Sequence, residues 1–298
     1  MVRRGTYSIV ARDPDTGELG AAVQSHWFSV GSIVTWARPG VGAVVTQSIA
    51  ERSYGPNLLD ALEGGAAPDA ALRGLLAADD AARFRQVAVI APAGPPATHT
   101  GDGAIAYAGH AAGDDFSVQA NMMAAASVWP AMAEAFTQST GPLSRRMLSA
   151  LRAAEAEGGD ARGKQSSAMI VVPASGAPWE KTVDLRVEDH PEPLDELERL
   201  LGVSDAYTLA TVGDDLTGEG RHSEAGDAYR AAAALQPDNH ELLFWAGLSE
   251  FGHGDREVGL AQVRRAIELQ PGWRELLGRL SADVAPDAGA VAAALGGR

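Results

Sequence analysis

The stretch TYSIVARDPDTGELGAAVQ, residues 6–24, predicts a β-hairpin and thereby decides the fold class of the first part of the chain. Residues 6–12 alternate in character as a strand does, and the run DPDTG at residues 13–17 has the composition of a tight turn. Residues 19–24 supply the second strand. Small and β-branched residues dominate here, as expected for strands that are covered on both faces.

Strand and helix signals then alternate up to about residue 190. A second hairpin is predicted over residues 32–37 and 42–48, and Gly101-Asp102-Gly103 predicts a further hairpin turn. Helical patterns mark residues 56–63, 68–78, 126–138 and 142–157, and strand-like runs mark residues 86–91, 116–122, 167–172 and 182–187. This order predicts two sheets covered by helices. We expect an α+β fold, a four-layer αββα sandwich, over residues 1–190.

The last third of the chain has a different pattern. Pro237 and Pro271 are 34 residues apart, which is the period of tetratricopeptide repeats. Helices are predicted over residues 194–201, 206–219, 223–235, 241–251, 257–269 and 274–280. We expect an all-α, tetratricopeptide-like domain of about two repeats with capping helices over residues 191–282, and a flexible segment over residues 283–298. Because two repeats bury little surface alone, this tail is either a stabilising or self-associating appendage or a surface that recognises a peptide or protein partner.

The charge of the chain excludes several kinds of partner. The net charge is −15, and residues 191–298 account for −10 of it, with nine arginines against 19 Asp and Glu. No basic stripe is present in the sequence, so a polyanion would be repelled. We expect neither nucleic acid nor an anionic membrane surface as a partner.

The absence of cysteine removes disulfides, thiolate zinc sites and a cysteine nucleophile at once. The histidines of the first part have no spacing typical of metal ligands, and we expect neither a metal nor a cofactor. The apolar run after the N-terminal arginine pair is too short for a secretory segment or a membrane helix, which need roughly 7–15 and about 20 apolar residues. These features together favour a cytoplasmic protein.

Polar residues interrupt the apolar strands at several strand ends. These clusters are SHWF at 25–28, TQS at 46–48, HTG at 99–101, QANM at 119–122 and GDARGKQSS at 159–167. Strand ends of a sandwich converge on one rim, and buried polar groups must find partners there, so we expect an active-site rim. For each residue taken alone, a purely structural role is the alternative.

Several of these motifs together resemble the family called domain of unknown function 1028. They are TYSIVARD at 6–13, AVQS to FSVG within 22–31, YG at 54–55, and the segments 119–122 and 160–166. The resemblance covers about residues 6–190. It implies the αββα fold of the N-terminal-nucleophile (Ntn) hydrolases, and the tail looks like an extension that is labelled peptidoglycan-binding in this family. The implied reaction is hydrolysis of an amide C–N bond by a Ser, Thr or Cys at the mature N-terminus, whose own α-amine is the general base.

Thr6 stands where the resemblance places this nucleophile. It becomes terminal if the Gly5–Thr6 bond is cleaved or if the chain starts nearer to Thr6; otherwise it is an ordinary strand threonine. The candidate catalytic residues are Thr6, Ser25, His99, Asn121 and Asp160, and the candidate substrate-binding residues are Gln47, Gln119, Arg162 and Gln165. Asn121, Gln119 and the backbone near Gln47 are candidate oxyanion donors. Arg162 suits a carboxylate substrate because its guanidinium forms a bidentate fork.

The function expected from the sequence is an amidohydrolase that acts on a small amide or a peptide-like metabolite. One alternative is a binding or scaffold protein that keeps the fold without turnover and uses its acidic tail for a protein partner. Another alternative, suggested by the label on the tail, is an enzyme of peptidoglycan turnover.

Overall fold

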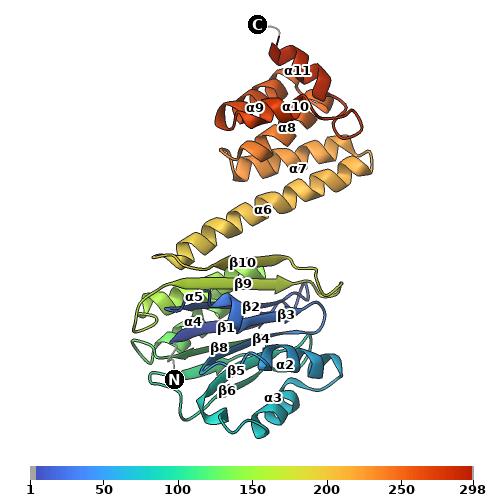
Figure 1. Cartoon of the computed structure of the whole chain (residues 1–298). Coiled ribbons are helices and arrows are strands. Elements are labelled where there is room, and N and C mark those ends of the chain that lie inside the picture. The colour runs from blue at the N-terminus through green and yellow to red at the C-terminus, as the bar shows by residue number, and fades with distance from the viewer. Residues whose placement is uncertain (1–4, 297–298) are drawn as a thin grey trace. The chain divides into compact units, whose positions relative to one another are not determined.

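The computed structural model describes residues 5–296, and two antiparallel sheets with packed helices lie in the first part of that range (Figure 1). The chain divides into two compact units, Met1–Glu198 and Arg199–Arg298. The first unit is mixed α+β and the second is helical. The α+β class and the helical C-terminal region are therefore as the sequence predicts.

The first sheet has six strands in the order β10-β9-β2-β1-β8-β7. Its strands are β1 (Thr6–Arg12), β2 (Leu19–Ser25), β7 (Gly109–Ala112), β8 (Phe116–Asn121), β9 (Ser166–Val172) and β10 (Val183–Val187). All neighbours are antiparallel, with Thr6 opposite Asn121 on β8 and Tyr7 opposite Gln24 on β2. The start of β1 therefore lies beside the ends of β2 and β8, and side chains of three strands meet there.

The second sheet has four strands in the order β3-β4-β5-β6, and its strands β4 and β5 contact β1 of the first sheet. Its strands are β3 (Thr35–Arg38), β4 (Gly42–Ser48), β5 (Arg85–Ile90) and β6 (Ala97–Thr100). Helices α2 (Tyr54–Glu63) and α3 (Pro68–Ala77) pack on this sheet, while α4 (Val128–Gln138) and α5 (Leu143–Ala156) pack on the first sheet. Two short helices, α1 (Gly31–Val34) and η1 (Ala82–Phe84), lie in connections.

The space between the sheets has an apolar half and a polar half. Val10, Val23, Val45 and Ile90 lie in the apolar half and are fully buried. The polar half contains buried side chains from both sheets, namely Ser8, Gln47, Gln86, Ser117, Gln119 and Asn121. An unpaired buried amide or hydroxyl costs about 1–3 kcal/mol, so we expect these groups to bond to one another across the two sheets. Among the polar atoms of these six side chains, Oδ1 of Asn121 is buried without a hydrogen-bond partner in the described residues.

Two expectations for the first unit are wrong. Gly101-Asp102-Gly103 is not a hairpin turn, because β6 before it belongs to the second sheet and β7 after it belongs to the first. Residues 32–37 are not one strand, since α1 occupies Gly31–Val34 and β3 begins only at Thr35. β6 and β7 were not predicted, because each has only four residues and lies at a sheet edge, where the apolar pattern is weak.

The helical unit consists of α6 from Arg199 onward and five further helices. The full bounds are α6 (Pro193–Gly218), α7 (His222–Leu235), α8 (His240–His253), α9 (Arg256–Leu269), α10 (Gly272–Leu277) and α11 (Ala288–Gly296). Phe244 of α8 is fully buried and stacks on Trp273 of α10 with ring centroids 4.4 Å apart. α8 and α9 approach so closely that a Cβ on Gly259 would lie 2.6 Å from the carbonyl oxygen of Gly247.

The structure differs from the expected domain bounds at both ends of this region. Pro193 begins α6 rather than marking a linker, because proline is tolerated in the first turn of a helix, and the first unit extends to Glu198. The two helices predicted over 194–201 and 206–219 are one helix. In the segment expected to be flexible, α11 forms and buries Val291 in the helical core.

Within residues 5–296, no helix combines the length and the apolar character that crossing a membrane requires. The same residues contain no group of three or more His, Asp or Glu that could hold a metal ion.

Candidate active site

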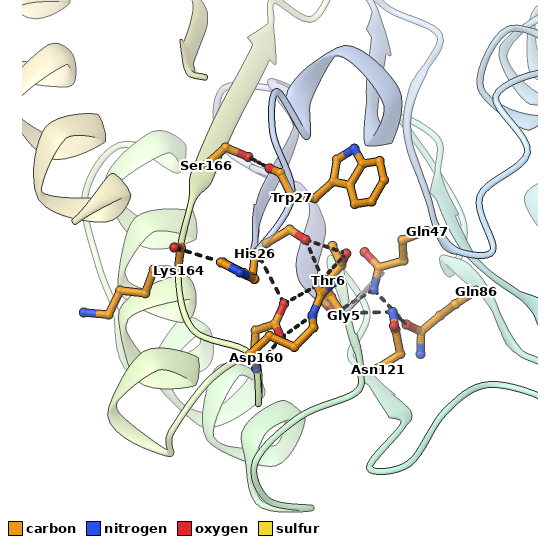
Figure 2. A network of polar contacts seen from close by, with 12 residues as sticks. Gly5, Thr6, His26, Trp27, Gln47, Gln86, Asn121, Asp160, Lys164 and Ser166 are labelled. Carbon is orange, nitrogen blue, oxygen red and sulfur yellow. Dashed lines mark hydrogen bonds and ion pairs between the residues drawn. The ribbon is translucent and has the colours of Figure 1, made fainter. Parts of the chain in front are cut away.

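The Gly5–Thr6 peptide lies where β1, β2 and β8 meet, and its carbonyl oxygen is the centre of the polar contacts there (Figure 2). The Thr6 hydroxyl donates to the Gly5 carbonyl oxygen at 2.6 Å and lies 3.1 Å from Oγ of Ser25. The Ser25 hydroxyl donates to the same oxygen, and Nη2 of Arg162 donates to it at 2.8 Å. Three side-chain donors thus converge on one peptide oxygen, and one of them is the hydroxyl of the next residue.

An ion pair between Asp160 and Arg162 borders this peptide on the Gly5 side. Nε and Nη2 of Arg162 donate to the two carboxylate oxygens at 3.0 and 2.7 Å, and the Asp160 side chain is fully buried. The backbone N–H of His26 donates to the same carboxylate at 3.0 Å. Charge-assisted bidentate bonds of this kind fix both partners in place. The pair therefore holds one donor of Arg162 on the Gly5 oxygen.

An amide network holds Thr6 from its other side. Nε2 of Gln47 lies 3.3 Å from the Thr6 carbonyl oxygen and 2.7 Å from Oε1 of Gln86, to both of which it donates. Nδ2 of Asn121 donates to the same two oxygens at 3.4 and 2.9 Å. Gln86, from β5, is thus the shared acceptor that orients both amides. The network lies opposite the Asp160 side of the peptide in Figure 2.

A second layer of polar contacts lies deeper between the sheets. Ser8 donates to Oε1 of Gln47 at 2.6 Å and accepts from Nε2 of Gln119 at 2.7 Å. Ser117 donates to Oε1 of Gln119 at 3.1 Å. Both ends of the Gln119 amide are therefore hydrogen-bonded, the nitrogen to Ser8 and the oxygen to Ser117. Ser8 and Gln119 are the next facing pair on this side of the sheet after Thr6 and Asn121.

Backbone strain gathers at this edge of the sheets. Among the residues described, the non-glycine residues with positive φ are Ser29 (55°), Ser48 (69°) and Met122 (56°). Ser48 ends β4 and Met122 follows β8, so both adjoin the polar network. Such conformations cost about 1–3 kcal/mol each and tend to occur at functional sites, where surrounding contacts hold them.

Tyr7 anchors β1 on the opposite face of the sheet. Its fully buried ring reaches α5, where the hydroxyl donates to Oε2 of Glu155 in the last turn of that helix. Burial, followed by the charge of Glu155, raises the pKa of Tyr7 well above its usual value. The phenol therefore stays protonated and keeps donating, which fixes the position of β1 and of the Gly5–Thr6 peptide.

The structure brings together most of the candidate residues. The residues in contact with the Gly5–Thr6 peptide or with its direct partners are Thr6, Ser25, Gln47, Asn121, Asp160 and Arg162. Gln119 lies in the deeper layer.

The structure does not bring His99 or Gln165 to Thr6. Nε2 of His99 lies 2.9 Å from the carbonyl oxygen of Ala82, on the face of β6 opposite to Thr98 and Thr100. Gln165 donates to Asp189 at 3.2 Å from a half-buried position just before β9. Neither side chain is placed for the catalytic or binding task that the sequence suggested for it.

Sequence reasoning missed Gln86 and Ser8, which are central to the network. Both are fully buried polar residues of otherwise apolar strands; Ser8 lies inside β1, and Gln86 is the second residue of β5. A polar residue in a covered strand is the available signal, because such a residue needs a partner across the sheets.

A protein family and a solved structure are similar to this chain. A family model described as "Family of unknown function (DUF1028)" matches residues 6–197. The crystal structure of protein SPO2555 from Silicibacter pomeroyi, described with the same family, is similar with a TM-score of 0.60 and 32% sequence identity. The match covers 66% of this chain and 88% of that chain. A search of curated proteins finds no significant match.

Proposed function

The chain belongs to the DUF1028 family of unknown function, and we propose that it is an N-terminal-nucleophile amidohydrolase whose nucleophile, Thr6, is freed by cleavage of the Gly5–Thr6 bond. The match to the family model begins at Thr6, so the residues before it lie outside the matched domain. The substrate class is a small amide or a peptide-like metabolite.

The contacts of the Gly5 carbonyl group carry this proposal. A hydroxyl group lies beside the peptide bond that must break, and the carbonyl oxygen accepts from Ser25 and Arg162. Donors held in advance on an oxygen that gains negative charge lower the barrier to acyl transfer. An ordinary strand threonine has no need of two further side-chain donors on the preceding carbonyl.

The cleavage proceeds as an acyl shift followed by hydrolysis. Oγ1 of Thr6 attacks the carbonyl carbon of Gly5, and the hydroxyl proton passes to the Thr6 nitrogen as the C–N bond breaks. The acyl group then forms an ester with Oγ1. Water hydrolyses this ester, which leaves a carboxylate on Gly5 and restores the Thr6 hydroxyl beside a free α-amine.

In the mature protein, the α-amine of Thr6 is the general base. A free α-amine has an ordinary pKa of about 8, so a useful fraction is neutral near pH 7–8 and accepts the hydroxyl proton during attack on the substrate. Ser25 and Arg162, released from the Gly5 oxygen, then hold the carbonyl oxygen of the substrate. Asn121 and Gln47 act as positioning residues instead of oxyanion donors, because their amides donate to the Thr6 carbonyl and to Gln86.

The finer fold description belongs to the same proposal. Two sheets in contact, with α4 and α5 on one and α2 and α3 on the other, are the arrangement expected of the four-layer αββα sandwich. We assign two helical pairs, the part of α6 from Arg199 onward with α7, and α8 with α9, to tetratricopeptide-like repeats on the 34-residue spacing of Pro237 and Pro271.

The burial of Thr6 favours a second candidate function, a binding or scaffold protein on the same fold. In the uncut chain the Thr6 residue is 1% exposed, so a substrate does not reach its hydroxyl. If the Gly5–Thr6 bond stays intact in the working protein, the site is sealed and the polar network only stabilises the sheets.

Intact-mass and N-terminal analysis of the purified protein separates these two functions. We expect a chain that begins at Thr6, while a Thr6→Ala variant keeps the residues before position 6. A fully active protein that retains Gly5 would rule out the free-amine mechanism. A Thr6→Ala variant that is cleaved at the same bond would show that an outside protease, not Thr6, makes the cut.

A further inference from the structure

The C-terminal unit contains a cavity of about 460 Å³ lined by α6, α7 and α8, unrelated to the proposed Thr6 chemistry. Its aromatic walls are Tyr207 of α6, Tyr229 of α7 and Trp245 of α8, and the buried Leu242 lies among them. Tyr207 is 38% exposed, so part of its ring is open to a ligand. The volume is within the roughly 300–1,000 Å³ of typical ligand sites.

Two carboxylates lie in this cavity, and each is held by a tyrosine. The Tyr229 hydroxyl donates to Oδ1 of Asp214 at 2.7 Å, and the Tyr207 hydroxyl donates to Oε2 of Glu241 at 2.8 Å. Burial raises the pKa of Tyr229 to about 12, so this hydroxyl remains a donor at neutral pH. The second oxygen of each carboxylate has no hydrogen-bond partner among residues 5–296 as described.

No positive charge of the described chain compensates these carboxylates. The residues that line the cavity include no arginine, lysine or histidine, and neither Asp214 nor Glu241 forms an ion pair in the described part of the unit. Residues 199–298 carry nine Arg, no Lys and 15 Asp and Glu, a net charge of −6. The local and the overall charge therefore both attract a cation.

A smaller hollow of about 90 Å³ extends the cavity along the helices. The two share the lining residues Thr217, Tyr229, Trp245 and Val284, so they form one elongated groove. The second hollow adds another carboxylate, Asp287, and the imidazole rings of His222 and His253, which stack on each other with centroids 4.1 Å apart. Because the lining continues from the cavity on α6, α7 and α8 to Asp287, an extended chain can contact both parts of the groove at once.

We propose that this groove, defined by Tyr207, Asp214, Tyr229, Glu241 and Trp245, binds an extended basic peptide segment of a partner protein. One Arg or Lys side chain of the peptide enters the cavity, where its cationic group contacts the aromatic faces and the free carboxylate oxygens. Aromatic faces attract such cations through their quadrupole, and an arginine also stacks on them. The peptide backbone continues toward the hollow at Asp287.

The test measures binding of an end-capped, fluorescein-labelled Ala-Arg-Ala-Arg-Ala peptide to the full chain by fluorescence anisotropy. We expect binding that the double substitution Asp214→Asn with Glu241→Gln weakens by about tenfold or more, the usual value of a hydrogen bond to a charged group. Both replacements keep an oxygen that accepts from the tyrosine, so the walls of the groove stay in place. As a control, Asp215→Asn removes one negative charge from the neighbouring α6 residue, which does not line the cavity, and we expect less than a twofold change from it.

Three further measurements complete the test. The same peptide with Gln in place of Arg should bind at least about tenfold more weakly, since it lacks the charge. Unchanged circular dichroism of the double variant excludes loss of fold as the cause. No binding at about 1 mM Arg peptide, equal loss in Asp215→Asn, or equal affinity for acetyl-arginine amide overturns the proposal; the last result would indicate a small-molecule site.

Discussion

Gly5 has room for a hydrogen atom on its Cα and for nothing larger. A Cβ at this position would lie 2.7 Å from Oδ1 and 2.8 Å from Oδ2 of Asp160. The carboxylate cannot move aside freely, because Arg162 and the backbone of His26 bond to both of its oxygens. The identity of the residue before Thr6 is therefore set by close packing against the ion pair.

Replacing Gly5 by Ala should slow the proposed cleavage by about 100-fold, since a displacement of about 1 Å has effects of this size on a reaction between held groups. The rate is followed by intact-mass spectrometry after synthesis of the chain. Gly74→Ala is the matched control, because a Cβ there meets no atom within 4 Å. Cleavage of Gly5→Ala at the normal rate would show that close packing of residue 5 against the Asp160–Arg162 ion pair is not needed for the reaction.

Replacing Ser25 by Ala removes one donor from the Gly5 carbonyl and leaves Thr6 and Arg162 in place. We expect cleavage slower by about 10²–10³-fold, the usual loss for one oxyanion donor. The measurement is the time course of the uncut and cut masses. A Ser25→Ala chain that matures as fast as the natural chain would remove Ser25 from the mechanism and leave Arg162 as the donor.

The sequence locates most of this site because its polar residues interrupt apolar strands. Ser25 and Asn121 end strands that flank β1, so their nearness to Thr6 follows from antiparallel pairing. The position of His99 could not be predicted, because strand β6 was not recognised and the parity of a strand decides which face a residue occupies. Gln86 was missed because only the second sheet, packed on the first, brings it to Thr6.

Helices α8 and α9 cross at two glycines. A Cβ on Gly247 would lie 2.8 Å from Cγ2 of Val263 and 2.9 Å from the backbone oxygen of Gly259. Backbone atoms cannot yield as a flexible side chain does. The close approach of these helices therefore depends on the absence of side chains at both positions.

Gly259→Ala should destabilise the helical unit by about 1–3 kcal/mol through overpacking, although alanine favours helices. Gly226→Ala in α7 is the control, since its Cβ meets the flexible end of Arg230 at 3.4 Å and Oγ of Ser249 at 4.0 Å, and it should stabilise by up to about 1 kcal/mol. Urea unfolding followed by tryptophan fluorescence compares them. If Gly259→Ala is at least as stable as Gly226→Ala, α8 and α9 are not too close at Gly259 to accept a Cβ atom.

The bounds of elements with strong sequence patterns could be predicted nearly to the residue, while those of elements with weak patterns could not. The expected strands at residues 6–12 and 42–48 coincide with β1 and β4, because turns rich in Gly, Pro and Asp bound them. The sequence predicts two helices over residues 194–201 and 206–219, and the gap between them contains Gly202, whereas α6 is continuous. One glycine costs a helix only about 1 kcal/mol, which the rest of α6 readily offsets.

The first unit ends beyond the two prolines that suggested a boundary. Leu194 and Leu197 are 4% and 0% exposed, and Ser167 donates to the carbonyl oxygen of Pro193 at 2.9 Å. Arg152 of α5 pairs with Asp195 at 2.9 Å and with Glu198. The beginning of α6 is therefore part of the first unit.

A chain that ends at residue 198 should be more stable than one that ends at residue 190 by at least about 3 kcal/mol, because two buried leucines contribute about 1.5–3 kcal/mol each. Urea unfolding of both shortened chains, followed by circular dichroism, measures this difference. Equal midpoints and slopes would show that residues 191–198 contribute nothing to the first unit.

The side-chain amide of Gln86 joins the two sheets and can report their transient opening. Nε2 of Gln86 donates to Thr100 at 2.9 Å in its own sheet, and lies 3.2 and 2.9 Å from the carbonyl oxygens of Gly109 and Ala120 in the other. Its two protons can exchange with deuterium only when the sheets part, so their exchange rate reports the free energy of that opening. The exchange rates of these two NMR signals can be compared before and after the Gly5–Thr6 bond is cleaved. The difference gives the contribution of the intact peptide to the free energy that keeps the sheets closed.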